Sequence, residues 1–76
     1  MKAEEIKKMV HAEPFRPFYL HIADGGKLLI THPDFVAISG TGRVMVVYPD
    51  SHEDDYQVID TALVTRIEQA KRSSSK

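Results

Sequence analysis

The spacing of the hydrophobic residues changes along the chain. Near the start, apolar residues recur every three or four positions, with Lys and Glu between them: Ala3, Ile6, Met9 and Val10. This spacing predicts an amphipathic helix over residues 2–12. Pro14 ends it, because the residue before a proline is pushed out of helical geometry. A helix this short needs a surface to pack on, so we expect it to cover a larger core.

Beyond the helix, every second residue is apolar. Phe18, Leu20 and Ile22 share one side of a strand predicted over residues 15–23, as expected for a strand with one buried face. Asp24-Gly25-Gly26 follows this strand. These residue types tolerate positive φ, which a tight hairpin turn requires. The sequence therefore predicts that the chain reverses here.

The returning strand is predicted to be bent. Residues 27–31 begin it and residues 35–39 continue it, with His32-Pro33-Asp34 between them. A proline cannot donate a hydrogen bond to a neighbouring strand, and it therefore marks a bulge, an edge or a break. Asp34 can bond the backbone two residues further on. We interpret this triplet as a structural bend.

Three further strands are expected. "RVMVVY", residues 43–48, is the run richest in β-branched residues and is the predicted central strand. "YQVID", residues 56–60, and "VTRIE", residues 64–68, are two short strands. Only Thr61-Ala62-Leu63 joins them, which leaves room for a tight turn of 3₁₀ type.

A short helix followed by five short strands is typical of a small β-barrel. We predict a mostly β fold: an N-terminal α-helix followed by a five-stranded, strongly bent antiparallel barrel of SH3-like or Sm-like form. It forms one domain over residues 1–68, and residues 69–76 form a disordered polar and basic tail.

Composition excludes several classes of protein. The chain has 76 residues, of which 42% are hydrophobic and 28% charged, and no cysteine. A disulfide framework, a thiolate zinc site and a cysteine nucleophile are therefore excluded. No run of 18 apolar residues and no signal-like segment is present. We expect a soluble, cytoplasmic protein with no membrane association.

The net charge of −1 is not that of a strong non-specific nucleic-acid binder. It is unevenly distributed, since residues 50–60 carry −5 and residues 61–76 carry +3. The acidic loop and the basic tail are either interaction surfaces or ordinary solvated surface.

Two stretches resemble the Sm-like family of small barrels. "FYLHIADGGKLLI" is similar to the first hairpin of that family, and "YQVIDTALVTRIE" is similar to its last two strands. The resemblance covers residues 4–68 and is one of fold. It implies RNA as a partner, and it implies rings in which the last strand of one subunit pairs with the fourth strand of the next.

The RNA-binding candidates are Arg16, Tyr19, His21 and Lys27. Lys27 stands where the family's first hairpin often carries a basic residue. Tyr19 and His21 can stack on bases, and Arg16 belongs to an aromatic and basic cluster before the first strand. Asp60 and Thr61 stand where the bacterial member carries a Lys-His pair that contacts RNA. A carboxylate there repels phosphate and argues against RNA at that position.

The last two strands are candidate edge strands with apolar alternation, and an open edge on so small a domain is a pairing surface. Self-association is therefore expected. The residues assigned to it are Tyr56, Val58, Val64, Arg66 and Ile67.

No catalytic or metal-binding pattern is present. The four histidines, His11, His21, His32 and His52, lack ligand spacing, and the acidic residues 50–55 lack the spacing and turn glycine of a calcium loop. We expect no enzyme, no metal and no cofactor. The predicted function is a non-catalytic binding module. One form is an Sm-like RNA-binding oligomer, and the other is a protein-interaction or structural domain without a nucleic-acid role.

Overall fold

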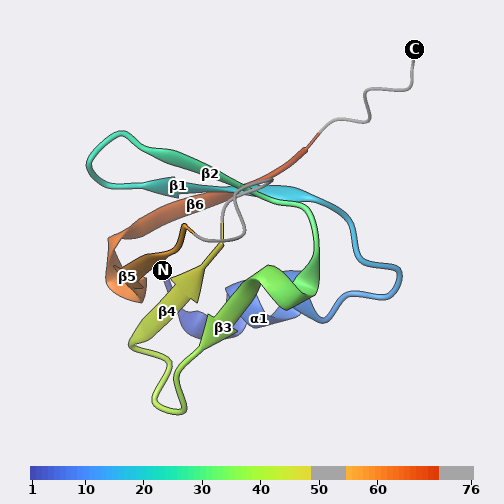
Figure 1. The fold of residues 1–76 in the computed structure, drawn as a ribbon, viewed down its shortest axis with the longest axis horizontal. Coiled ribbons are helices and arrows are strands. Elements are labelled where there is room, and N and C mark those ends of the chain that lie inside the picture. Colours follow the sequence, from blue (N-terminus) through green and yellow to red (C-terminus); the bar gives the residue numbers. More distant parts are fainter. Residues whose placement is uncertain (49–54, 71–76) are drawn as a thin grey trace.

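The computed structural model of the protein describes residues 1–48 and 55–70. These residues form one α-helix, two 3₁₀-helices and six strands, and the strands make two antiparallel three-stranded sheets, ordered β2-β1-β6 and β3-β4-β5 (Figure 1). The elements are α1 (Ala3–Val10), β1 (Phe18–Ile22), β2 (Lys27–Ile30), η1 (Pro33–Phe35), β3 (Val36–Ile38), β4 (Val44–Val47), β5 (Gln57–Asp60), η2 (Thr61–Leu63) and β6 (Val64–Gln69), where η denotes a 3₁₀-helix.

The mostly β fold and the N-terminal helix are confirmed, but instead of the predicted five-stranded barrel the described residues form two separate three-stranded sheets. The predicted second strand divides at η1 into β2 and β3, which belong to different sheets. No strand pairing between the two sheets is present in the described residues. The reason is local: Pro33 begins η1, and the His32 Nδ1 atom accepts a hydrogen bond from the Asp34 N–H at 3.1 Å. The triplet is therefore a bend, held by His32 rather than by the Asp34 side chain.

A second 3₁₀-helix joins the sheets at the other end of the chain. The Asp60 Oδ1 atom accepts a hydrogen bond from the Ala62 N–H at 2.9 Å and caps η2. This confirms the predicted 3₁₀ turn. Each crossing between the sheets is thus a single helical turn fixed by the side chain that precedes it.

The core lies between the sheets and α1. In β1 the alternation is as predicted, because Phe18 and Leu20 are fully buried while Tyr19 and His21 face the other side. The fully buried side chains of the core are Ile6, Phe18, Leu20, Ile30, Met45, Val47 and Val64. Burying a side chain of this size contributes roughly 1.5–3 kcal/mol, so this small set supplies much of the folding free energy.

The helix is shorter than the predicted 2–12. It places Ile6 and Val10 in the core and lies beside β3 (Figure 1). Phe15 follows the helix and packs on Phe18, with 5.9 Å between the ring centroids. This contact fixes the path by which the chain leaves the helix and enters β1.

The remaining strand predictions hold, and the ends of the domain differ slightly. β4 is the centre of its sheet, as predicted. β6 ends at Gln69, one residue past the predicted domain end. The acidic residues 50–54 and the tail residues 71–76 lie outside the described residues. Among the helical residues that the structure describes, none belongs to a segment that is long and apolar enough to cross a bilayer.

Candidate interaction surfaces

The outer side of the β2-β1-β6 sheet carries polar and aromatic side chains, which we call the polar face: Tyr19, His21, Lys27, Arg66 and Glu68. Strand register brings them together. His21 lies between Lys27 on β2 and Arg66 on β6, and Tyr19 is paired with Glu68. Sequence reasoning placed Tyr19, His21 and Lys27 among the RNA-binding candidates, and the structure brings these three together.

The side chains of the polar face contact one another. The Lys27 ammonium lies 4.5 Å from the centroid of the Tyr19 ring, a cation–π contact. The His21 Nε2 and Glu68 Oε1 atoms are 2.8 Å apart. A carboxylate only accepts, so the imidazole N–H donates. That nitrogen then cannot also accept from the Arg66 guanidinium 3.5 Å away; we interpret this second distance as proximity without a hydrogen bond.

These contacts change the acidity of Glu68. The hydrogen bond from His21 lowers the pKa of the Glu68 carboxyl below its ordinary value, and the nearby charges of His21, Arg66 and Lys27 act in the same direction. Partial desolvation opposes them. Glu68 therefore remains a carboxylate under mildly acidic conditions, and the polar face keeps a negative charge among its cations.

The outer side of the β3-β4-β5 sheet differs in character, and we call it the apolar face. Register places Ala37, Val46 and Val58 in one row across the three strands. Val44 lies on β4, and Tyr48 follows β4 with its ring 6.0 Å from that of Tyr56. Val58 is 63% exposed and Tyr56 is 60% exposed. Large apolar side chains thus remain in water on neighbouring strands.

The apolar face reaches an open edge. Within the described residues, β5 pairs only with β4, and β6 pairs only with β1. Val58 on β5 and Arg66 on β6 point outward. Tyr56, just before β5, is also exposed, whereas Val64 is buried in the core and Ile67 packs against it. These two side chains anchor β6 instead of facing a partner.

Arg16 does not join the polar face. It is exposed in the segment before β1 and makes none of the contacts described above. Glu68 and Arg66 were missed as members of this face. Their place beside His21 follows from the pairing of β6 with β1, which includes an irregularity between His21 and Ile22, and local sequence spacing does not encode that pairing.

In the part of the chain that the structure describes, no three His, Asp or Glu side chains are close enough together to hold a metal ion. His52 and the acidic residues 50, 53 and 54 lie outside that part. Comparisons of the chain with models of protein families, with curated proteins and with solved structures give no match.

Proposed function

We propose that this protein is a non-catalytic binding module that associates with further copies of itself, the β5 edge of one copy pairing with the β6 edge of the next. The observation that carries this is the apolar face at the open β5 edge, where Tyr56 and Val58 are more than half exposed. Exposed apolar side chains beside unpaired backbone groups favour the addition of another strand.

The distribution of charge along the chain supports a second copy of this protein as the partner of the β5 edge. The described residues of and next to β5, 55–60, carry two carboxylates, Asp55 and Asp60, and no cation, whereas β6 carries Arg66 and Glu68 and no net charge. Pairing β5 of one copy with β5 of another therefore opposes like charges, whereas pairing β5 with β6 does not. The contact is therefore heterologous, and it generates a ring or an open chain of subunits.

Sedimentation velocity over a range of protein concentrations, combined with native mass spectrometry of protein purified without nuclease, tests this proposal. We expect a discrete species larger than the monomer. Val58→Lys places a charge on the β5 edge and should weaken association by about tenfold or more, equivalent to about 1.4 kcal/mol, with circular dichroism unchanged.

His11→Lys is the matched control, because His11 is exposed at the end of α1 and far from β5 in the sequence. It should leave the assembly intact. A protein that sediments as a monomer at every concentration, or a Val58→Lys variant that assembles like the parent, would contradict the proposal.

RNA binding is the second candidate, and the polar face favours it. Tyr19, Lys27 and Arg66 combine an aromatic ring with two cations on one sheet surface, which is the combination that binds single-stranded nucleic acid. The Glu68 carboxylate in the same cluster acts against it. The net charge of −1 also makes non-specific binding weak.

The salt dependence of binding to a short single-stranded RNA separates this candidate from the first. Lys27→Ala should lower the affinity and flatten the slope of affinity against salt by about one phosphate contact. Arg16→Ala should change the affinity and its salt dependence less than Lys27→Ala does, because Arg16 lies outside the polar face. RNA binding with an unchanged slope in Lys27→Ala would remove the polar face from consideration.

A further inference from the structure

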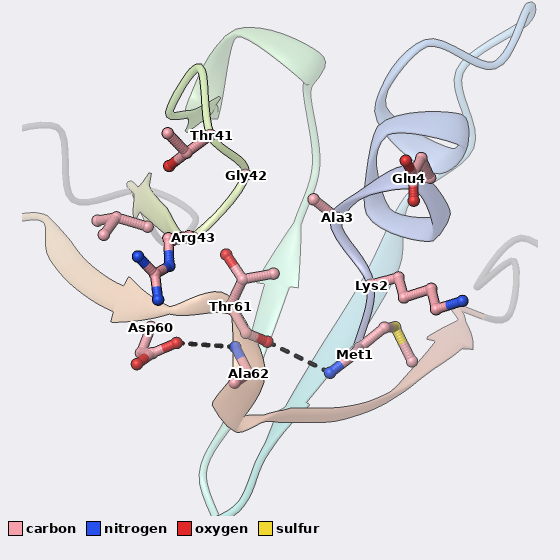
Figure 2. Close-up of a pocket in the computed structure, with 11 residues that line it drawn as sticks. Met1, Lys2, Ala3, Glu4, Thr41, Gly42, Arg43, Asp60, Thr61 and Ala62 are labelled. Atoms are coloured by element: carbon pink, nitrogen blue, oxygen red, sulfur yellow. Dashed lines mark hydrogen bonds between the residues drawn. The ribbon is translucent and has the colours of Figure 1, made fainter.

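A groove of about 700 Å³ opens on a different part of the molecule. Three segments form its walls: residues 1–4 at the start of α1, residues 41–44 before and within β4, and residues 60–62 at η2. Figure 2 shows these segments facing one another, with Thr61 between Arg43 and Ala3. Of the residues that make up the polar face and the apolar face, Val44 alone lines this groove.

Thr61 is the unusual residue of this groove. It is only 3% exposed, and its Oγ1 atom has no hydrogen-bond partner within the described residues. Its side chain points from η2 into the space between Arg43 and Ala3 (Figure 2). A buried hydroxyl without a partner costs about 1–3 kcal/mol. The hydroxyl is therefore an unused donor in the lining of the groove.

The start of α1 supplies further donors. Lys2 is the N-cap residue and provides no side-chain cap. In the described structure, the N–H groups of Ala3 and Glu4 have no hydrogen-bond acceptor. The first N–H groups of a helix carry partial positive charge and bind anions. The groove therefore holds three donors without an acceptor: the N–H groups of Ala3 and Glu4 and the hydroxyl of Thr61.

Arg43 is the cation beside Thr61 in this groove, whereas the Lys2 side chain extends away from both residues (Figure 2). Arg43 takes part in no ion pair with a described residue. Of the two carboxylates in the lining, Asp60 accepts a hydrogen bond from the Ala62 N–H, and Glu4 forms no ion pair within residues 1–48 and 55–70. The Met1 ammonium donates to the carbonyl oxygens of Thr61 and Val64, at 3.4 and 3.0 Å.

We propose that this groove binds the phosphate group of a small molecule. The Thr61 hydroxyl and the N–H groups of Ala3 and Glu4 donate to its oxygens, and Arg43 balances its charge. The volume exceeds that of a phosphate ion and falls in the range of small-molecule sites. The remainder of the ligand therefore occupies the open part of the groove.

Amide NMR titrations with inorganic phosphate and with glycerol 3-phosphate, at constant ionic strength against sodium chloride, test the assignment. We expect saturable shifts at Ala3, Glu4, Gly42 and Ala62, with glycerol 3-phosphate binding more tightly. Equal affinities would overturn the small-molecule ligand in favour of free phosphate. Equal shifts with chloride, or tighter binding of acetate, would overturn the phosphate site.

Thr61→Val distinguishes a ligand-binding role from a structural one. It keeps the shape of the side chain and removes the hydroxyl. We expect phosphate affinity to fall by about tenfold, while the melting temperature without phosphate rises because an unpaired buried group is gone. Unchanged affinity would overturn the role of Thr61 in the site.

Charge variants complete the test. Arg43→Gln should also weaken binding by about tenfold. Lys8→Gln removes a cation of the same helix outside the groove and should bind phosphate like the parent. Equal weakening in Lys8→Gln and Arg43→Gln would show a general charge effect and would overturn the site.

Discussion

The two sheets of this protein have the same number of strands but opposite outer faces. On the β2-β1-β6 sheet the outward side chains satisfy one another, through the Lys27–Tyr19 contact and the His21–Glu68 hydrogen bond. On the β3-β4-β5 sheet the outward residues are valines and tyrosines, and Val58 and Tyr56 remain more than half exposed.

The difference shows that an apolar side chain on a strand is not necessarily a core side chain. In β4, Met45 and Val47 are buried, whereas Val44 on the other side of the strand is 41% exposed. A face whose polar groups pair internally is stable in solvent as it stands. A face of valine and tyrosine exposes apolar area whose burial requires another molecule. The contrast between the faces, more than either face alone, supports self-association as the leading function.

The largest expected effect concerns the anchoring of the β2-β1-β6 sheet. Ile67→Lys forces a charge against the core from the edge strand β6, where Ile67 is paired with Leu20. We expect a loss of about 2–4 kcal/mol in the free energy of unfolding, measured by urea titration. Arg66→Ala, at the neighbouring outward position, should cost under about 0.5 kcal/mol. Similar losses in both variants would mean that the β6 register is wrong.

The hairpin turns of the two sheets provide the next comparison. Gly25 and Gly42 both have positive φ, at 98° and 78°. A Cβ atom at Gly25 would meet nothing within 4 Å, whereas one at Gly42 would lie 2.9 Å from the Ala3 Cβ atom. Gly25→Ala should therefore cost about 1 kcal/mol and Gly42→Ala about 2 kcal/mol or more.

Thermal unfolding of both variants and of the Ala3→Gly, Gly42→Ala double variant checks this explanation. The double variant should recover part of the loss, because the overlapping methyl group is gone. Equal destabilisation at both glycines, with no recovery, would show that backbone conformation is the whole effect.

A smaller effect separates the edge of the apolar face from its centre. Val44 is 41% exposed on β4, whose backbone is paired on both sides, whereas Val58 lies on the open strand β5. If strands pair edge to edge, Val44→Lys should weaken association by about threefold, less than Val58→Lys. Sedimentation of the two variants at matched concentration measures this. A stronger effect of Val44→Lys would indicate packing of faces instead of edges.

The smallest effect concerns acidity on the polar face. The pKa of Glu68 is lower in the folded chain than its ordinary value of 4.5. Its contribution to stability is therefore present above that value and is lost as the pH falls through the folded pKa. His21→Ala should raise the pKa of Glu68 more than Lys27→Ala does, followed by carboxyl NMR titration. A larger shift in Lys27→Ala would contradict the role of the hydrogen bond.

Local patterns predicted the helix, the hairpin at Gly25, the central strand β4 and the 3₁₀ turn at η2, since each depends on residues close in sequence. Two sheets form instead of one five-stranded barrel because His32-Pro33-Asp34 divides a strand, and where the two halves then pair depends on distant partners. The polar face was predicted in part. Tyr19, His21 and Lys27 belong to one hairpin, whereas Glu68 joins them only through the pairing of β6 with β1.

The sheet order has a consequence for how the chain folds as it leaves the ribosome. The β3-β4-β5 sheet draws its strands from one continuous stretch, residues 36–60, and all of them emerge before β6. β1 emerges early but lacks its second neighbour until residues 64–69 are made. Until β6 pairs with β1, Phe18 and Leu20 lie on a strand that has at most one neighbour, so the last strand closes the core.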